Sequence, residues 1–187
     1  MSNSETGHSA LNSYISMLRG INVSGRKKVN MKELEKLYET LGLKNVQTYI
    51  QSGNVVFQTP EADALSLAGK IERKIEQSFG FNVPIFIRTK GEFQKLIKNN
   101  PFPGRDESKL HVTFLYSKPA SLPMDEIVRA KDNAEEFSSS GREIYLFLPN
   151  GYGRTKLSNS FFERKSKVLA TTRNWRTLNT LFSMSNG

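Results

Sequence analysis

Glycines and basic residues share the stretch RGINVSGRKK, residues 19–28, called the first basic loop below. Gly20 and Gly25 have the spacing of the two glycines in a Walker A loop. In a true Walker A loop, Lys and then Ser or Thr follow the second glycine and contact the phosphates and Mg²⁺. Here Arg26 and Lys27 take those places, so the magnesium-binding hydroxyl is missing. The spacing therefore does not predict a nucleotide hydrolase.

The same loop has the residues of a simpler anion site. Backbone amides that follow a glycine turn and precede a helix can hold phosphate, and neighbouring cations add attraction. The alternative is an ordinary glycine turn with solvated lysines. The candidate anion-binding residues of this loop are Arg19, Gly20, Asn22, Arg26, Lys27 and Lys28.

A second basic loop has a similar plan within LPNGYGRTKLSN, where an apolar run leads into glycines and then cations. Tyr152, between two glycines, is placed to stack on a nucleobase, a contact that tolerates any sequence. The alternative is a loop with a packed tyrosine. The candidate residues of this loop are Gly151, Tyr152, Gly153, Arg154 and Lys156.

The segment ATTRNWRTL adds two further candidates, Arg173 and Arg176. The planar guanidinium fork of arginine matches phosphate and carboxylate oxygens. Trp175 shares one helical face with Leu178 and Leu181, which favours a place in the core over a ligand-stacking role.

Catalytic patterns are scarce, so the sequence leaves open whether the protein is an enzyme. His8 lies near the N-terminus, and His111 stands alone in an apolar run. Lys156 with Ser158 or Ser160 could form a Ser-Lys pair, but such pairs are common by chance. Because no metal-ligand or known catalytic motif is present, no metal and no cofactor are expected.

The positive charge is concentrated in two regions. The net charge is +9, from 27 Lys and Arg against 18 Asp and Glu. Residues 19–28 carry +4 and residues 154–176 carry +6, which leaves the rest of the chain at about −1. Regional basicity is typical of a surface that meets an anion. The alternative is that the two regions point in different directions once the chain has folded.

Length and composition indicate a globular protein of 187 residues, either one large domain or two small ones. The chain contains no cysteine, which excludes disulfides and thiolate chemistry and favours the cytoplasm. No apolar run approaches the roughly 18 residues of a membrane span. Residues 1–11 lack the features of a signal peptide, and we expect them to form a disordered tail.

The first half predicts the order β-α-β-β-α-β, the ferredoxin-like plan. A helix is expected to begin after Asn30, because Asn is a favoured N-cap residue and Glu33 follows three residues later. Pro84 places the last strand at a sheet edge. The expected strands are 12–19, 46–50, 54–58 and 83–88, with helices over 31–41 and 65–79.

The second half predicts a partial β-α-β-β-α repeat after a helix at 92–99, with a final helix where a fourth strand would lie. We therefore expect an α+β protein of two ferredoxin-like subdomains with antiparallel sheets, residues 12–89 and 90–187. The strands are expected at 110–117, 135–138 and 143–148, and the helices at 125–132, 157–167 and from 174. We expect the first and third strands of each subdomain to run parallel, so that the loops after them leave at the same end of the sheet and each subdomain presents its basic loop there.

Several stretches resemble the bacterial domain of unknown function 1697 family. Its N-terminal signature is similar to LRGINVSGRKKVNMKELEKLYETLGLKNVQTYIQSGNVVF. Its later landmarks are similar, in the same order, to FNVPIFIR, NPF, HVTFL, LPNGYGRTKLSN and ATTRNWRTL. Ser24 stands where the family more often has a second glycine, and Thr155 where serine is frequent. The resemblance implies a cytoplasmic bacterial protein of two small α+β subdomains, and it implies no activity.

These observations lead to one preferred hypothesis and two alternatives. The preferred hypothesis is a protein that binds an anion, either nucleic acid or a nucleotide, through both basic loops. The first alternative is an enzyme that acts on a phosphorylated or carboxylated small molecule in a cleft between the subdomains. The second is an interaction module for an acidic protein. No membrane partner is expected, and the oligomeric state is open.

Overall fold

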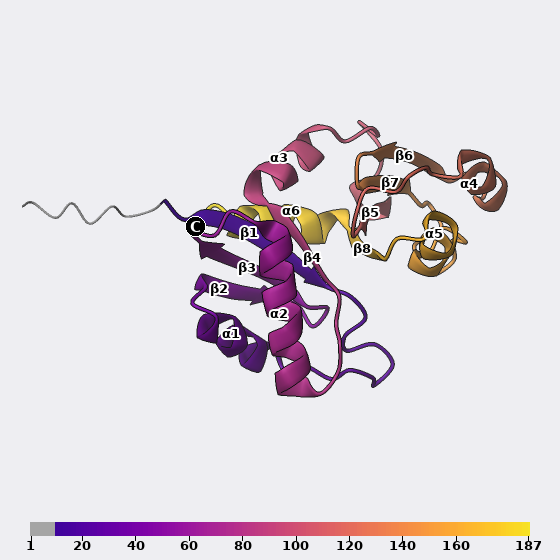
Figure 1. Cartoon of the computed structure of the whole chain (residues 1–187). Coiled ribbons are helices and arrows are strands. Elements are labelled where there is room, and N and C mark those ends of the chain that lie inside the picture. The colour runs from indigo at the N-terminus through magenta and orange to yellow at the C-terminus, as the bar shows by residue number, and fades with distance from the viewer. Residues whose placement is uncertain (1–9) are drawn as a thin grey trace, which may run out of the picture.

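The computed structural model describes residues 10–187, which form two four-stranded antiparallel sheets (Figure 1). Most of the tail expected at residues 1–11, including His8, lies outside the described residues. Within residues 10–187, no helix is both long enough and apolar enough to cross a membrane. The α+β class predicted from the sequence is confirmed, with one difference in the second sheet.

The first sheet has the strand order β2-β3-β1-β4, the ferredoxin-like arrangement. Strand β4 is an edge strand, as Pro84 predicted. The elements of this half are β1 (Asn12–Leu18), α1 (Met31–Thr40), β2 (Lys44–Tyr49), β3 (Asn54–Thr59), α2 (Ala64–Phe79) and β4 (Ile85–Thr89).

Local capping explains where both helices of this half begin and end. The Asn30 side chain accepts hydrogen bonds from the backbone N–H groups of Lys32 and Glu33, so α1 starts where the sequence predicted. Asp63 caps α2 in the same way. Gly80 ends α2 with a left-handed conformation, φ 77°, which a glycine adopts without a steric penalty.

The second sheet has the order β6-β7-β5-β8, so it repeats the complete ferredoxin-like arrangement. The expectation of a partial repeat is therefore wrong, because Ala170–Asn174 forms the fourth strand and pairs with β5. The elements of this half are α3 (Lys90–Lys98), a short 3₁₀ turn (Glu107–Lys109), β5 (Leu110–Leu115), α4 (Met124–Ala130), β6 (Glu136–Ser140), β7 (Glu143–Phe147), α5 (Asn159–Ser166), β8 (Ala170–Asn174) and α6 (Trp175–Met184).

Strand direction corrects the expected position of the basic loops. Strand β1 runs antiparallel to β3, and β5 runs antiparallel to β7. In each sheet the loop after the first strand and the loop after the third strand therefore leave at opposite ends. The first basic loop follows β1, whereas the second follows β7, so the two loops do not occupy equivalent places in the repeat.

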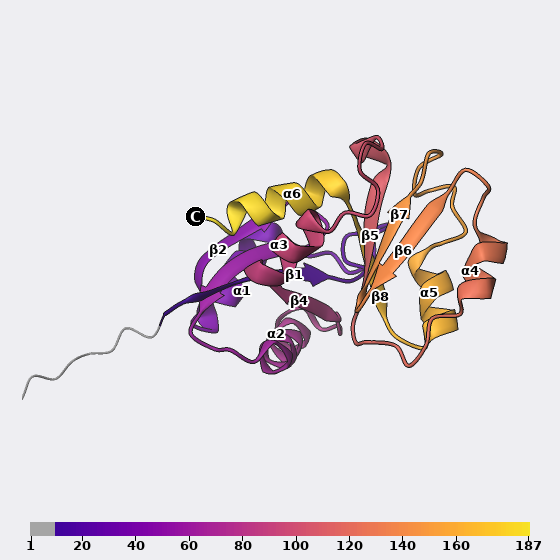
Figure 2. The ribbon, with the colours of Figure 1, turned by 90° about the horizontal axis from the view of Figure 1, so that it is seen from above.

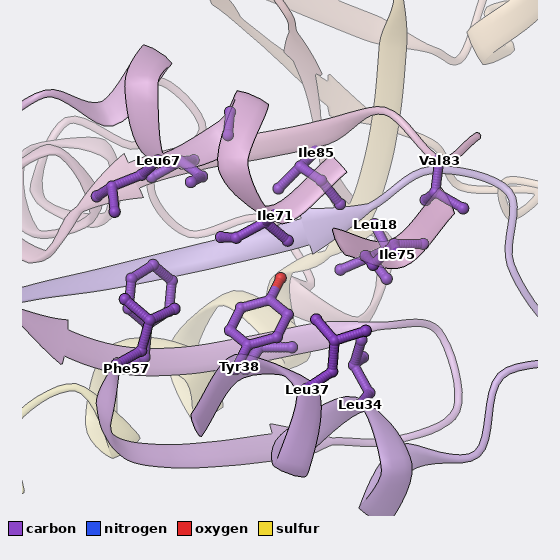
Figure 3. Packing of buried hydrophobic residues seen from close by; sticks show 14 of the residues in the cluster. Leu18, Leu34, Leu37, Tyr38, Phe57, Leu67, Ile71, Ile75, Val83 and Ile85 are labelled. Atoms are coloured by element: carbon purple, nitrogen blue, oxygen red, sulfur yellow. The ribbon is translucent and has the colours of Figure 1, made fainter. Parts of the chain in front are cut away.

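Each sheet packs one face against its own pair of helices. The first core lies between the first sheet and helices α1 and α2, and it includes Leu34, Tyr38, Ile71 and Ile75 (Figure 3). A corresponding core, with Leu146, Leu157 and Phe162, lies between the second sheet and helices α4 and α5. Burial of these apolar side chains supplies the main driving force for each unit.

A third, central core joins the two halves. It contains residues from the remaining faces of both sheets and from helices α3 and α6. Figure 2 shows α6 lying along the first sheet, while α4 and α5 lie on the outer side of the second. The boundary proposed at residues 89 and 90 separates the two sheets, but this core belongs to both. Its buried members include Ile15, Met17, Val56, Phe86, Phe93, Leu96, Val112, Phe114, Tyr145, Trp175, Leu178 and Leu181.

Candidate functional site

The first basic loop folds back on itself as a small hairpin. Val23 and Arg26 form a β-bridge around Ser24 and Gly25, both of which have positive φ. The N–H group of Arg26 donates to the Val23 carbonyl at 3.0 Å, and that of Asn22 donates to the Lys27 carbonyl at 3.1 Å. These amides are therefore already occupied within the loop, which argues against the phosphate cradle expected there.

Side chains of the same loop also have partners within the protein. The Asn22 side chain donates to the carbonyls of Val29 and Gln51, and it accepts from the Val29 N–H group. The Lys27 ammonium donates to the Asn82 carbonyl at 2.6 Å and lies 5.9 Å from the centre of the Phe81 ring. The loop is thereby fastened to the β2–β3 turn and to the segment before β4.

Arg19 binds to the other half of the molecule. Its guanidinium donates two hydrogen bonds to the Glu163 carboxylate of α5, at 2.7 and 2.6 Å, and a third to the Ala170 carbonyl. The Glu163 carboxylate also accepts from the Ala170 N–H group. This bidentate ion pair occupies the edge of the Arg19 guanidinium that was expected to bind an anionic ligand.

Arg173 is buried and fully hydrogen-bonded, so the proposal that it contacts an anion is not supported by its geometry. Its guanidinium donates to the carbonyls of Leu18 and Ser52 and to the Asn54 side chain, all in the first half. It also donates to Thr171 Oγ1 and the Thr172 carbonyl. These contacts use all five N–H donors of the fork.

Burial lowers the pKa of the Arg173 guanidinium to about 10. A group with this pKa is still charged at neutral pH, and among residues 10–187 it has no carboxylate partner. Neutral oxygens alone therefore solvate this charge. Arg173 joins the end of β1 and the β2–β3 turn to β8, which is a structural function.

A second buried arginine joins the halves from strand β4. Arg88 donates to the Glu143 carboxylate at 2.8 Å and to the Leu115 carbonyl at 2.9 Å. Burial lowers the pKa of the Arg88 guanidinium, and the attraction of Glu143 opposes that shift. Arg88 is 2% exposed, so this pair belongs to the interior.

A cavity of about 230 Å³ adjoins this pair, between α3 and the β6–β7 hairpin. Arg88 is its one lining residue from the predicted first subdomain, so the cavity lies almost wholly in the second and not in a cleft between the two. Its two carboxylates already form ion pairs, Glu143 with Arg88 and Glu92 with Arg142. The Tyr145 hydroxyl in its wall donates to the Leu96 carbonyl. The two carboxylates and the tyrosine are therefore engaged, and Lys95 is the one lining cation that forms no ion pair within residues 10–187.

The second basic loop is anchored by its tyrosine. The Tyr152 hydroxyl donates to Thr172 Oγ1 at 3.2 Å and accepts from the Asn159 N–H group at 3.1 Å. Its ring stacks on His111, with centroids 5.5 Å apart. Burial lowers the pKa of His111, and a hydrogen bond with the Lys109 carbonyl opposes this shift. Both the hydroxyl and one ring face of Tyr152 are thus used within the protein, as the alternative of a packed tyrosine stated.

Beyond that anchor, Arg154 and Lys156 are exposed and line a cavity of about 250 Å³. Arg129, at the end of α4, and Lys131, just after it, line the same cavity. None of these four cations forms an ion pair within residues 10–187. Four basic and two acidic side chains, those of Asp132 and Glu135, give the cavity wall a formal charge of +2. We call this the basic pocket.

The predicted anion-binding residues thus separate into three groups. Arg154 and Lys156 line the basic pocket, with Gly151, Tyr152 and Gly153 in the loop that carries them. The second group donates side-chain hydrogen bonds to other parts of the protein: Arg19, Asn22, Lys27 and Arg173. The third group is exposed and does not line the basic pocket: Gly20, Arg26, Lys28 and Arg176.

Sequence reasoning missed Arg129 and Lys131. They belong to a short amphipathic helix and its last turn, where cations are usually solvated or interact with the helix dipole. Only the packing of α4 beside the β7–α5 connection brings them to Arg154. The signal available in the sequence was the pairing of RAK at 129–131 with the later RTK at 154–156.

Comparison with known proteins places the chain in a family. Residues 11–145 match the family described as "Protein of unknown function (DUF1697)". The chain belongs to the DUF1697 family. This confirms the resemblance to the family, and the matched residues include the first basic loop but end before the second. A search of curated proteins finds none that matches this chain.

A solved structure supports the fold of this DUF1697 protein. It is described as the structure of conserved bacterial protein SP0830 from Streptococcus pneumoniae. The two chains are 25% identical, the TM-score is 0.71, and the match covers 94% of this chain and 99% of the other. Neither comparison assigns an activity, so function has to be argued from the basic pocket.

Proposed function

We propose that this protein binds a small phosphorylated ligand, such as a nucleotide, in the basic pocket. One observation carries the proposal: four cations from two separate segments surround one cavity and have no carboxylate partner within the described residues. Like charges gathered around one cavity repel one another, so an anion that enters the cavity relieves that repulsion. A cavity of about 250 Å³ is close to the lower end of small-molecule sites.

The chemistry of the cations favours phosphate. Arg129 and Arg154 offer planar forks that can each donate two parallel hydrogen bonds to phosphate oxygens. Lys131 and Lys156 add two compact charges at the same cavity. A carboxylated ligand would use the same donors, but it carries less charge and fewer acceptor oxygens.

A nucleic-acid strand fits the molecule less well than a small ligand does. Ferredoxin-like RNA-binding modules stack bases on aromatic side chains of an open sheet face. Here the corresponding faces of both sheets lie in the central core, where Phe86 and Phe114 are buried under α3 and α6. This supports a ligand held in the basic pocket and not one spread across a sheet.

The test is a binding titration by calorimetry with ATP, AMP and inorganic phosphate as probes. The double variant Arg154→Ala/Lys156→Ala removes two cations of the basic pocket and should weaken binding of the best probe by about tenfold or more. The matched control is Arg26→Ala/Lys28→Ala, which removes the same charge from exposed positions of the first basic loop. It should change the affinity by less than about threefold, because exposed distant charges are screened by salt.

The outcome of this pair of variants decides between the hypotheses. Equal losses of affinity in both variants would show that only the net charge matters, and would overturn the proposal that the basic pocket binds the ligand. Binding of a single-stranded oligonucleotide that is stronger than binding of ATP would favour the nucleic-acid hypothesis. The cytoplasmic location stays a prediction from the composition, and so does the alternative of an acidic protein partner.

A further inference from the structure

The basic pocket contains two carboxylates, those of Asp132 and Glu135, and neither forms an ion pair within residues 10–187. Glu135 lines the cavity, yet the residue is only 3% exposed. Its Oε2 atom accepts a hydrogen bond from the Asp132 N–H group at 3.0 Å. Within residues 10–187, Oε1 has no hydrogen-bond partner and the carboxylate forms no ion pair.

The Glu135 carboxylate is not expected in a site that binds only a simple anion such as inorganic phosphate. A buried carboxylate repels phosphate and thereby weakens any site that only has to hold charge. The protein itself gives this carboxylate a hydrogen bond at Oε2 only, and Oε1 keeps access to solvent, because no side-chain oxygen of the described residues is both buried and without a partner. The repulsion is offset when the ligand brings a hydrogen-bond donor to Oε1 together with an anionic group for the cations.

We infer that Glu135 accepts a hydrogen bond from a hydroxyl group of the ligand, so that the basic pocket selects sugar phosphates and nucleotides over simple phosphates. The inference rests on the proposed function and specifies its substrate class. A carboxylate that receives a ribose hydroxyl beside a phosphate-binding element is a common solution in nucleotide-binding proteins. The cavity of about 250 Å³ has room for a ribose phosphate unit.

The geometry also assigns different tasks to the two carboxylates of the pocket. Asp132 is exposed, and its Oδ1 accepts from the Ala134 N–H group, so it stabilises the turn after α4. Glu135 is the buried one, it lines the cavity, and its Oε1 atom has no hydrogen-bond partner within residues 10–187. Only Glu135 is therefore expected to distinguish a ligand with hydroxyl groups from one without them.

The experiment compares two probes, ribose 5-phosphate and methyl phosphate, by calorimetry. In the unchanged protein, ribose 5-phosphate should bind about tenfold more tightly than methyl phosphate, the gain typical of one hydrogen bond to a charged acceptor. The Glu135→Gln variant keeps the shape and an acceptor for the Asp132 N–H group but removes the charge. It should bind methyl phosphate more tightly and ribose 5-phosphate more weakly, which are shifts in opposite directions.

The matched control is Asp132→Asn, which removes one negative charge from the same pocket at an exposed position. It should strengthen the binding of both probes equally and leave their ratio unchanged. If Glu135→Gln does not fold, the ratio of the two probes in the unchanged protein is still decisive. Equal affinities there would overturn the inference while leaving the proposed function intact. Failure of both probes and of ATP to bind would instead overturn the proposed function.

Discussion

The two basic loops look alike in the sequence but differ in what their cations contact. In the first loop, Arg19 pairs with Glu163 and Lys27 donates to the Asn82 carbonyl, so these cations hold the fold together. In the second loop, Arg154 and Lys156 have no ion-pair partner within residues 10–187 and line a cavity. The first loop contributes to the junction between the halves, and the second contributes to the candidate site.

The difference follows from where each loop lies in the ferredoxin-like plan. The first loop leaves β1 at the end that faces β8 of the other half, where carbonyls and Glu163 are available. The second loop leaves β7 beside α4, whose last turn is also basic. The cations of the first loop lie beside carbonyl and carboxylate oxygens and stabilise the fold. Those of the second loop lie beside other cations and stay available to a ligand.

The largest expected effect comes from the buried arginine of the junction. Arg173→Met should lower the free energy of unfolding by about 3–5 kcal/mol, because the acceptors on Leu18, Ser52 and Asn54 lose their donor in the interior. Urea denaturation followed by circular dichroism measures this loss. Arg176→Met, an exposed arginine three positions later, is the control and should stay within about 0.5 kcal/mol. Similar losses in the two variants would contradict the structural role of Arg173.

The next largest effect tests the close contact between the β2–β3 turn and the first basic loop. At Gly53 φ is +72°, and a Cβ atom there would lie 2.6 Å from Ile21 Cδ1 and 2.7 Å from Leu18 Cβ. Gly53→Ala should therefore destabilise the protein by about 2–3 kcal/mol through overpacking and backbone strain. Gly151→Ala in the second loop has φ +82° but open space, and only the conformational penalty of about 1 kcal/mol is expected. A smaller loss for Gly53 than for Gly151 would show that this contact is not tight.

A moderate effect is expected for the ion pair of the first loop. Both side chains are partly buried, with 32% of the Arg19 side chain and 17% of the Glu163 side chain exposed. Arg19→Ala should therefore lower the free energy of unfolding by about 1 kcal/mol, and raised salt should reduce that difference. A double-mutant cycle with Glu163→Gln isolates the coupling between the two side chains. A coupling energy near zero would show that the pair contributes no net stability.

The smallest effect concerns His111, which stacks on Tyr152 of the second loop. Burial lowers the pKa of His111 below its ordinary value of 6.5, so the unfolded chain binds a proton at higher pH than the folded one does. The stability linked to this residue is present above pH 6.5 and declines as the pH falls below it. In His111→Gln, thermal unfolding midpoints measured from pH 7 to 5 should depend less on pH. An unchanged dependence would exclude His111 as a contributor.

Much of the fold could be predicted because its signals are local. Asn30 and Asp63 cap helices within three residues of their own positions, and Gly80 ends α2. Strand β8 was missed because ATTRN is short and polar, with Arg173 as its fourth residue. That arginine is compatible with a buried strand only because acceptors from the other half surround it.

The sequence by itself determined the two βαββ patterns, the helix boundaries, the regional basicity and the family, since each depends on neighbouring residues or on composition. Only the tertiary structure decided which cations within residues 10–187 lie outside ion pairs and line a common cavity. The guanidinium groups of Arg19 and Arg173 are engaged by partners more than 100 residues away. In contrast, Arg129 and Lys131 become part of a candidate site only because a loop about 25 residues later lines the same cavity. Charge is a property of each residue, but an unpaired charge is a property of the packing around it, because a partner at hydrogen-bond distance removes it from the surface that a ligand meets.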